Sequence, residues 1–127
     1  MNKKYQILKD IFGHDKFRSF QEEVVDSIIN KQDVLTILPT GGGKSLCYQL
    51  PTLLMDGVTV VISPLIALMQ DQIKALNDLD IKAKMISSSQ SNDENNFTMQ
   101  KLLNGELKFI YVAPERFTSN EFVSVLQ

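Results

Sequence analysis

Cysteine is nearly absent from this sequence, and it contains no long hydrophobic run. The one cysteine, Cys47, excludes an intramolecular disulfide framework and a cysteine-rich zinc site. No apolar segment reaches the roughly 18 residues that a membrane-spanning helix requires. The first residues are not followed by the apolar stretch of a secretory signal. We therefore expect a soluble protein of the cytoplasm that has no membrane partner.

An excess of charge of one sign is also missing. Thirteen Lys and Arg residues stand against fifteen Asp and Glu residues, which gives a formal net charge of −2. A compact nucleic-acid-binding protein often has a strongly basic surface, and this composition does not supply one. Any contact with nucleic acid must therefore come from local geometry or from other parts of a longer protein.

What the chain does contain is enough apolar material for one globular core. Of its 127 residues, 43% are hydrophobic and 22% are charged, values that are typical of folded domains. Apolar spacing predicts alternating helices and strands, with capping boxes at Ser19/Glu22 and Thr118/Glu121. The expected helices are 3–12, one that begins at Ser19, 44–54, 65–79, 93–103 and 120–126. The expected strands are 33–38, 58–62, 83–86 and 107–112.

This alternation predicts the fold class and the organisation of the chain. Strands that alternate with helices favour a parallel, doubly wound α/β sheet, here preceded by two N-terminal helices. We expect residues 1–31 to form those helices and residues 32–127 to form the sheet domain. Ligands of such sheets bind beyond the carboxyl ends of the strands. The loops to consider are therefore 39–45, 63–65, 87–92 and 113–117.

A glycine-rich loop is the strongest chemical signal. It follows a predicted buried strand and opens a helix, and its sequence is Leu38-Pro39-Thr40-Gly41-Gly42-Gly43-Lys44-Ser45. Backbone amides can turn inward around an anion only where glycine tolerates the crowding, and the helix N-terminus adds partial positive charge. In a Walker A loop the lysine reaches the β and γ phosphates and the hydroxyl ligates Mg²⁺. Leu38 departs from the strict pattern, which has glycine there.

A second candidate segment is Phe17-Arg18-Ser19-Phe20-Gln21-Glu22. A planar amide such as that of Gln21 can donate and accept at once, which matches the amino group and ring nitrogen of adenine. The guanidinium of Arg18 can stack on a base or reach a phosphate. We interpret this segment as a base-recognition element placed before the phosphate loop.

Four blocks of this sequence together resemble the RecQ family of superfamily 2 DNA helicases. The blocks occur in the family's order and cover nearly the whole chain. They are residues 12–21, residues 40–51, residues 63–72 (Ser-Pro-Leu-Ile-Ala-Leu-Met-Gln-Asp-Gln) and residues 111–117 (Tyr-Val-Ala-Pro-Glu-Arg-Phe). The resemblance implies a RecA-like P-loop NTPase fold. It also implies an ATP-dependent helicase that moves 3′ to 5′ on DNA in recombination and repair, and that is nucleoid-associated in a bacterium.

The resemblance also assigns roles to residues. It implies ATP and Mg²⁺ as cofactors, with Lys44 as the catalytic phosphate ligand and Ser45 as the metal ligand. The implied nucleotide-binding residues are His14, Arg18, Gln21, Thr40, Gly41, Gly42, Gly43, Lys44 and Ser45. His14 stands where the family usually has a stacking aromatic residue. The residues implied to line the path of single-stranded or partly duplex DNA are Ser63, Pro64, Leu65, Glu115 and Arg116.

An acidic Walker B box is missing from the sequence. ATP hydrolysis requires a carboxylate that holds Mg²⁺ and another that orients water. Asp93-Glu94 follows a serine-rich loop, and Glu115 has no aspartate before it. We expect the chain to be part of a first motor domain that needs the remaining helicase domains as partners. Alone, it should bind ATP weakly at most and should not unwind DNA.

Two alternatives stay open on the residues alone. A small-molecule P-loop kinase shares the Gly-Lys-Ser loop, but it would need an arginine-bearing lid, and the only arginines here are Arg18 and Arg116. The other alternative is a nucleotide-binding module without turnover. Cys47 lies on the helix after the loop, and we expect it to be buried as a small hydrophobic side chain.

Overall fold

The computed structural model describes residues 3–18, 20–35, 44–87 and 90–114. The chain divides into two compact units, residues 1–56 and 57–127. This division into units falls at residue 56, after the helix that follows the glycine-rich loop. The sequence predicted a boundary between functional segments at residue 31, and that boundary stays a prediction. The predicted helix 120–126 and its capping pair lie outside the described residues.

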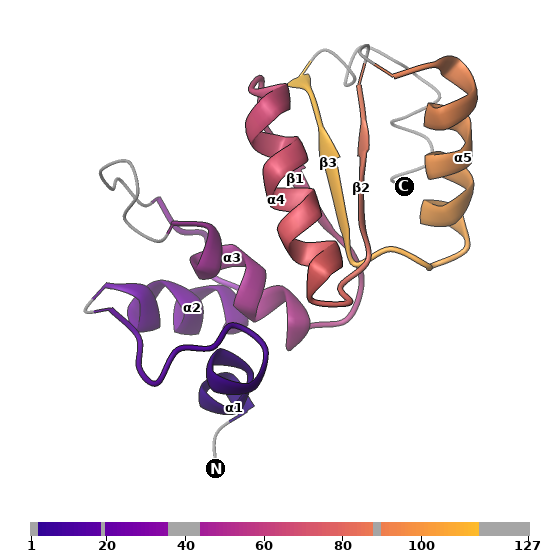
Figure 1. The fold of residues 1–127 in the computed structure, drawn as a ribbon. Helices are drawn as coiled ribbons and strands as arrows, with labels where there is room; N and C mark the ends of the chain where they lie inside the picture. The colour runs from indigo at the N-terminus through magenta and orange to yellow at the C-terminus, as the bar shows by residue number, and fades with distance from the viewer. Residues whose placement is uncertain (1–2, 19, 36–43, 88–89, 115–127) are drawn as a thin grey trace. The chain divides into compact units, whose positions relative to one another are not determined.

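In the first unit, the residues that the structure describes form three helices (Figure 1). They are α1 (Lys3–Asp10), α2 (Gln21–Ile29) and α3 (Lys44–Leu53). Each has an apolar stripe at helical spacing, and the stripes meet in a small core. The fully buried members of that core are Leu8, Val25 and Leu50, with Leu46 beside them. Gly13, at φ +74°, ends the first helical segment where the sequence predicted a stop.

A buried lysine ties α1 to α2. The Nζ atom of Lys4 lies 2.6 Å from a carboxylate oxygen of Asp26 and 2.9 Å from one of Glu22. These partners raise the pKa of Lys4, with the hydrogen bond to Asp26 the larger cause. The Tyr5 hydroxyl also donates to Glu22, and this hydrogen bond, followed by that of Lys4, lowers the pKa of Glu22. The cluster therefore holds the two helices in register through charge as well as packing.

The start of α2 differs from the prediction. The helix begins at Gln21, and Phe20 at its N-cap makes no side-chain capping hydrogen bond. Ser19 lies outside the described residues, and the Glu22 carboxylate is engaged by Lys4 and Tyr5. A box-like exchange exists one residue earlier, since the Gln21 side chain accepts from the Arg18 amide. The predicted pairing of Ser19 with Glu22 therefore stays a prediction, and the described partners of Glu22 lie on α1.

The described residues of the second unit form a three-stranded parallel sheet with helices between the strands (Figure 1). Its elements are β1 (Thr59–Ile62), α4 (Ile66–Asp78), β2 (Ala83–Ile86), α5 (Asn92–Leu103) and β3 (Phe109–Val112). The strand order is β1-β3-β2, with β3 in the centre and fully buried. The two crossovers run in opposite directions across the sheet, so right-handed connections place α4 and α5 on opposite faces. Figure 1 shows that arrangement.

The predicted strand 33–38 is not borne out where the structure describes it. Residues 33–35 are not part of a strand, and Leu35 is 88% exposed. Residues 36–38 lie outside the described part. An apolar run becomes a strand only when a neighbouring strand satisfies its backbone groups, and the three described strands pair with one another instead. The incomplete parallel α/β fold that the sequence predicted is otherwise confirmed.

Candidate functional site

A cavity in the first unit joins the two nucleotide motifs that the sequence analysis singled out. Its volume is about 300 Å³. Four predicted nucleotide-binding residues line it, namely His14, Arg18, Gln21 and Ser45. The first three precede α2 or begin it, and Ser45 lies in the first turn of α3. Packing of α2 against α3 therefore brings together residues that are more than twenty positions apart in the sequence.

Gln21 is held in one orientation in this cavity. Gln21 is only 4% exposed. Its side-chain Oε1 atom accepts a hydrogen bond from the Arg18 backbone amide at 2.8 Å. The backbone amide of Gln21 in turn donates to the backbone carbonyl of Arg18 at 3.0 Å. This reciprocal pair fixes which end of the carboxamide is the acceptor. A fixed amide can discriminate between bases because its donor and acceptor cannot exchange places.

Three cationic or imidazole side chains stand around that buried amide. His14, Lys16 and Arg18 are exposed residues that line the same cavity. The turn after α1 places His14, since its amide donates to the Leu8 carbonyl at 3.0 Å. An imidazole and a guanidinium both offer flat faces for stacking on a base, and the cations suit an anionic ligand.

The phosphate loop itself is described only at its end. Lys44 begins α3, and Ser45 is half-buried at the wall of the cavity. Thr40, Gly41, Gly42, Gly43 and the side chain of Lys44 lie outside the described residues, so their predicted roles stay predictions. The position of Ser45 in the first helical turn agrees with a loop that delivers its anion to a helix N-terminus.

The donor set around Ser45 fits magnesium bound through a nucleotide. Among the described residues, no group of three or more His, Cys, Asp or Glu side chains could hold a metal ion. Mg²⁺ commonly takes only one or two protein oxygens and completes its shell with phosphate oxygens and water. The Ser45 hydroxyl would supply one of these oxygens, and the carboxylate that ATP hydrolysis also requires is not among the residues that line this cavity. Bound there, the ion would neutralise developing charge on the phosphates.

Two further residues line the cavity but are not among the nucleotide-binding residues that the resemblance implies. Gln49 is buried and Lys16 is exposed, and both line the cavity. Gln49 stands four residues after Ser45 on α3, so the two side chains share one helix face. That spacing could have indicated Gln49, whereas nothing in the local pattern distinguishes Lys16. Cys47, on the same helix, is buried as expected, and burial raises the pKa of its thiol.

The residues that the sequence assigned to DNA lie in the second unit. The Ser63 amide donates to the Val112 carbonyl at 3.1 Å, which fixes it at the carboxyl end of β1. The Ser63 hydroxyl accepts from the Leu65 amide at 3.1 Å, and Leu65 is the N-cap residue of α4. Pro64 and Leu65 are exposed. Glu115 and Arg116 lie outside the described residues.

Comparison with known proteins gives a family and a set of relatives. Residues 18–126 match the DEAD/DEAH box helicase family. The chain is 46% identical over 120 residues to an ATP-dependent DNA helicase RecQ from Haemophilus influenzae, covering 94% of this chain and 19% of that protein. It is 45% identical to the protein of the same name from Bacillus subtilis, over 100% of this chain and 22% of the relative. The chain therefore spans about a fifth of the length of these curated relatives.

Solved structures agree at the level of the fold. A helicase named MrfA, solved with DNA and AMPPNP, superposes with a TM-score of 0.72 at 21% identity, covering 94% of this chain and 18% of that one. A hypothetical ATP-dependent RNA helicase from Sulfolobus tokodaii superposes with a TM-score of 0.70 at 18% identity, covering 98% of this chain and 38% of that one. Within the described residues of this chain, no helix is both long and apolar enough to cross a bilayer.

Proposed function

This chain belongs to the DEAD/DEAH box helicase family, and from that premise we propose that it is part of the first motor domain of a RecQ-type, ATP-dependent 3′–5′ DNA helicase. The intact protein would couple ATP hydrolysis to unwinding of DNA during recombination and repair, in the cytoplasm or on a bacterial nucleoid. Single-stranded or partly duplex DNA is its proposed substrate. The remaining helicase domains are its proposed partners.

The observation that carries this proposal is the cavity of the first unit. It joins the Gln21 amide, two flanking side chains with flat faces (His14 and Arg18), and the hydroxyl of Ser45. Adenine would take its hydrogen bonds from Gln21, while His14 or Arg18 stacks on the ring. The polyphosphate would extend to the amides of residues 40–45 and to Lys44, and Ser45 would ligate Mg²⁺. A kinase also binds ATP through such a loop, but the family match of residues 18–126 supports the helicase.

Ser63, Pro64 and Leu65 supply the proposed DNA contact of the second unit. They follow β1 and precede α4, where the Leu65 N-cap makes no side-chain capping hydrogen bond. Amides at a helix start can hold a phosphate without a charged side chain. Glu115 and Arg116 would extend this path. Such contacts accommodate DNA on a chain whose formal net charge is −2.

Base selectivity is the sharpest test. Isotope-labelled chain is titrated with Mg·ATP and Mg·GTP, and binding is followed by chemical-shift changes at Gln21, Ser45 and Gln49. We expect ATP to bind about tenfold more tightly, because two correct hydrogen bonds to a buried amide contribute roughly 1–2 kcal/mol. Gln21→Ala should remove this preference, while Lys44→Ala should weaken both nucleotides.

Gln6→Ala is the matched control, because Gln6 is an exposed glutamine on α1 outside the cavity. It should leave both affinities unchanged. Equal losses for ATP and GTP in Gln21→Ala would reject the adenine role. We expect no appreciable ATP turnover by this chain, since it contains no Walker B box, and a measured turnover above that of Lys44→Ala would contradict this assignment.

A further inference from the structure

The outer edge of β2 is mostly closed by side-chain amides. β2 is the terminal strand of the described sheet, and pairing of Ala83 with Phe109 turns the backbone groups of Lys82 and Lys84 toward β3. The groups of Ala83, Met85 and Ser87 therefore point outward. The caps described next come from Asn77 on α4, Gln90 in the segment before α5, and Asn95 on α5.

Four of these outward groups have amide partners. Asn77 Oδ1 accepts from the Ala83 amide at 3.2 Å, and Gln90 Nε2 donates to the Met85 carbonyl at 2.7 Å. Asn95 takes both groups of Ser87, accepting from its amide at 3.3 Å and donating to its carbonyl at 2.9 Å. An edge strand with its backbone groups occupied resists unselective strand addition.

One acceptor and one donor on this edge have no hydrogen bond within the described residues. They are the Ala83 carbonyl and the Met85 amide, which flank Lys84. A strand that pairs opposite Lys84 uses these two groups, whether it runs parallel or antiparallel to β2. Pairing opposite Lys82 would need the Ala83 amide, and pairing opposite Ile86 would need the Met85 carbonyl, which are both capped. The amides therefore leave a single register open.

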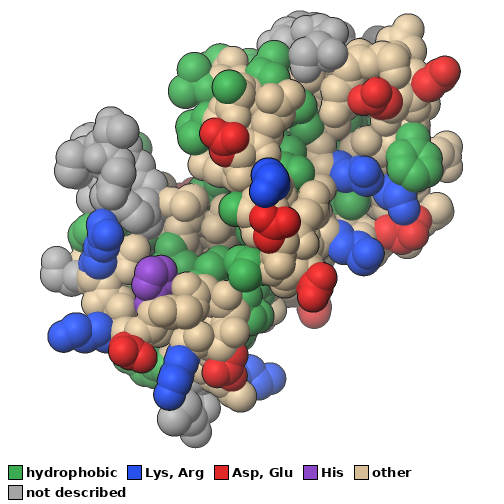
Figure 2. Space-filling view, in the orientation of Figure 1, with side chains coloured by type: hydrophobic (Ala, Val, Ile, Leu, Met, Phe, Trp, Pro, Cys, Tyr) green, Lys and Arg blue, Asp and Glu red, His purple; other side chains and the backbone are tan. Residues whose placement is uncertain are grey.

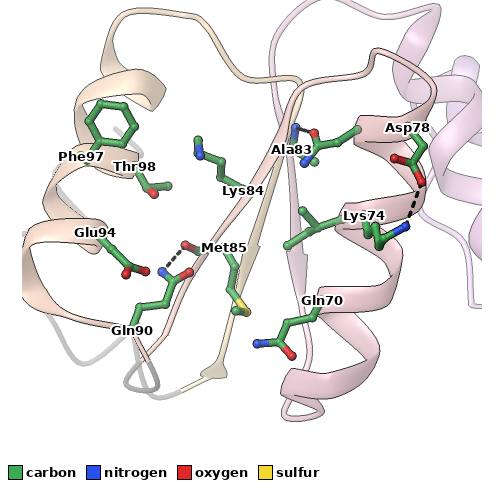
Figure 3. A pocket seen from close by; sticks show the side chains of 12 residues that line it. Gln70, Lys74, Asp78, Ala83, Lys84, Met85, Gln90, Glu94, Phe97 and Thr98 are labelled. Atoms are coloured by element: carbon green, nitrogen blue, oxygen red, sulfur yellow. Dashed lines mark hydrogen bonds and ion pairs between the residues drawn. The ribbon is translucent and has the colours of Figure 1, made fainter.

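This open pair lies in a walled cavity. The cavity has a volume of about 520 Å³ and is lined by α4 on one side and α5 on the other, with Ala83, Lys84 and Met85 between them (Figure 3). Ala83 is 2% exposed and Met85 is 6% exposed, so the Ala83 carbonyl and the Met85 amide belong to buried residues. An unsatisfied buried amide is costly, and a ligand that pairs with it removes that cost.

The side chains around the open pair carry more positive than negative charge beside Lys84, although Glu94 of α5 also lines the main cavity. A smaller cleft that continues from the cavity is lined by Lys82, Lys84 and Lys101, with Glu106 as its one carboxylate. Lys101 lies 3.6 Å from Glu106, which leaves two lysines in excess. Lysine side chains gather on this face of the second unit (Figure 2). Phe97 is 56% exposed. The centre of its ring lies 5.6 Å from the Nζ atom of Lys84 and 5.0 Å from that of Lys101.

We propose that this cavity binds an extended acidic peptide segment of a partner protein, which adds to β2 in the one register opposite Lys84. The peptide residue opposite Lys84 points to the same face as the lysines, so an aspartate or glutamate there meets their charge. Its two neighbours point to the α4 face, where Ile73 and Met85 favour apolar side chains. A strand-shaped ligand is favoured over nucleic acid because the open donor and acceptor have the spacing of a β-ladder.

The probe is the peptide Ac-Thr-Val-Asp-Val-Thr-NH₂, titrated into the full labelled chain. We expect shifts centred on the Met85 amide, which gains a hydrogen bond. A peptide with lysine in place of the central aspartate should bind roughly fivefold more weakly or worse, because it repels Lys84. A peptide methylated on its main-chain nitrogens cannot donate to the Ala83 carbonyl, and it should produce no Met85 shift.

Protein variants separate charge from fold. Lys84→Gln should weaken the acidic peptide several-fold, while Lys9→Gln, an exposed lysine on α1, should not. Gln90→Ala uncaps the Met85 carbonyl and should permit a second register without abolishing binding. The proposal is overturned if backbone methylation has no effect, if Lys84→Gln and Lys9→Gln behave alike, or if an oligothymidylate displaces the peptide with higher affinity. None of these readouts involves nucleotide, so they remain independent of the proposed helicase activity.

Discussion

Asn95→Ala should lower the local stability of the β2 edge more than replacement of Asn77 or Gln90 by alanine. Asn95 is 2% exposed and Ser87 is fully buried. The asparagine satisfies the amide and the carbonyl of Ser87, and it also accepts from Gln90 Nε2 at 2.7 Å. One side chain thus ties α5, the end of β2 and the Gln90 cap together.

The magnitude follows from the groups that would be left unpaired. A buried backbone group without a partner costs about 1–3 kcal/mol. The Ser87 carbonyl keeps a second donor, the Gln90 amide at 3.3 Å, so its loss is partial. We therefore expect Asn95→Ala to lower the local stability of this region by about 2–4 kcal/mol. Asn96→Ala is the control, because Asn96 is exposed and lies next to Asn95 on the same helix.

Hydrogen exchange is the suitable assay, because a chain with two compact units need not unfold in a single step. Where exchange reports local opening, 2–4 kcal/mol corresponds to amide exchange that is roughly 30- to 1,000-fold faster in β2. Amides of α2 should be unaffected. If exchange at residues 83–87 changed by less than about threefold, or if Asn96→Ala gave the same acceleration, the cap would not have the weight assigned to it.

Two further predictions concern the first unit. Lys4→Met should lower its stability by about 1 kcal/mol at pH 7, because the ammonium pairs with two half-exposed carboxylates. The folded chain lowers the pKa of Glu22, so the ionised carboxylate contributes to the stability of the folded state. This contribution is fully present above the ordinary carboxyl pKa of about 4.3, and it is lost as the pH falls through the lowered pKa. Urea unfolding at pH 7 and pH 3 should therefore show a smaller acid loss for Lys4→Met than for the unmodified chain, and equal losses would contradict the pairing. The thiol of Cys47, whose pKa burial raises, should react with a disulfide reagent at pH 8 at least about tenfold more slowly than in urea. Comparable rates with and without urea would show that the thiol is accessible in the folded chain.

Most of the regular elements could be predicted from local patterns. The predicted strand 83–86 is identical to β2, and α3, α4 and α5 lie within a residue of their predicted bounds at each end. The helices have an apolar period of 3.6, and the strand is a short, largely apolar segment followed by a polar loop; such patterns depend only on neighbours in sequence. The segment 33–38 has the same kind of apolar run, but its described part is exposed coil. A strand requires a partner, and a run of letters does not state where its partner lies.

The cavity of the first unit, which we propose binds a nucleotide, was predicted in part. Arg18, Gln21 and Ser45 were selected for their chemistry and spacing, and His14 was implied by the family resemblance; the structure brings all four to one cavity. Gln49 entered only through packing of α3 against α2. Glu22 was predicted to form a capping box with Ser19, which lies outside the described residues, and its described partners, Lys4 and Tyr5, lie on another helix. Spacing along one element predicts contacts within it, and it does not predict contacts with a neighbour.

The sequence by itself determined most of the alternation of helices and strands, the glycine-rich motif at residues 38–45, and the family resemblance, because each depends on residues that are close together in the chain. Only the tertiary structure decided that β3 lies in the centre of the sheet, that β2 forms its edge, and that three amides from separate segments leave one register of that edge open. These features arise from groups that meet across elements. Their free energy depends on burial and hydrogen-bond geometry, which no local pattern encodes.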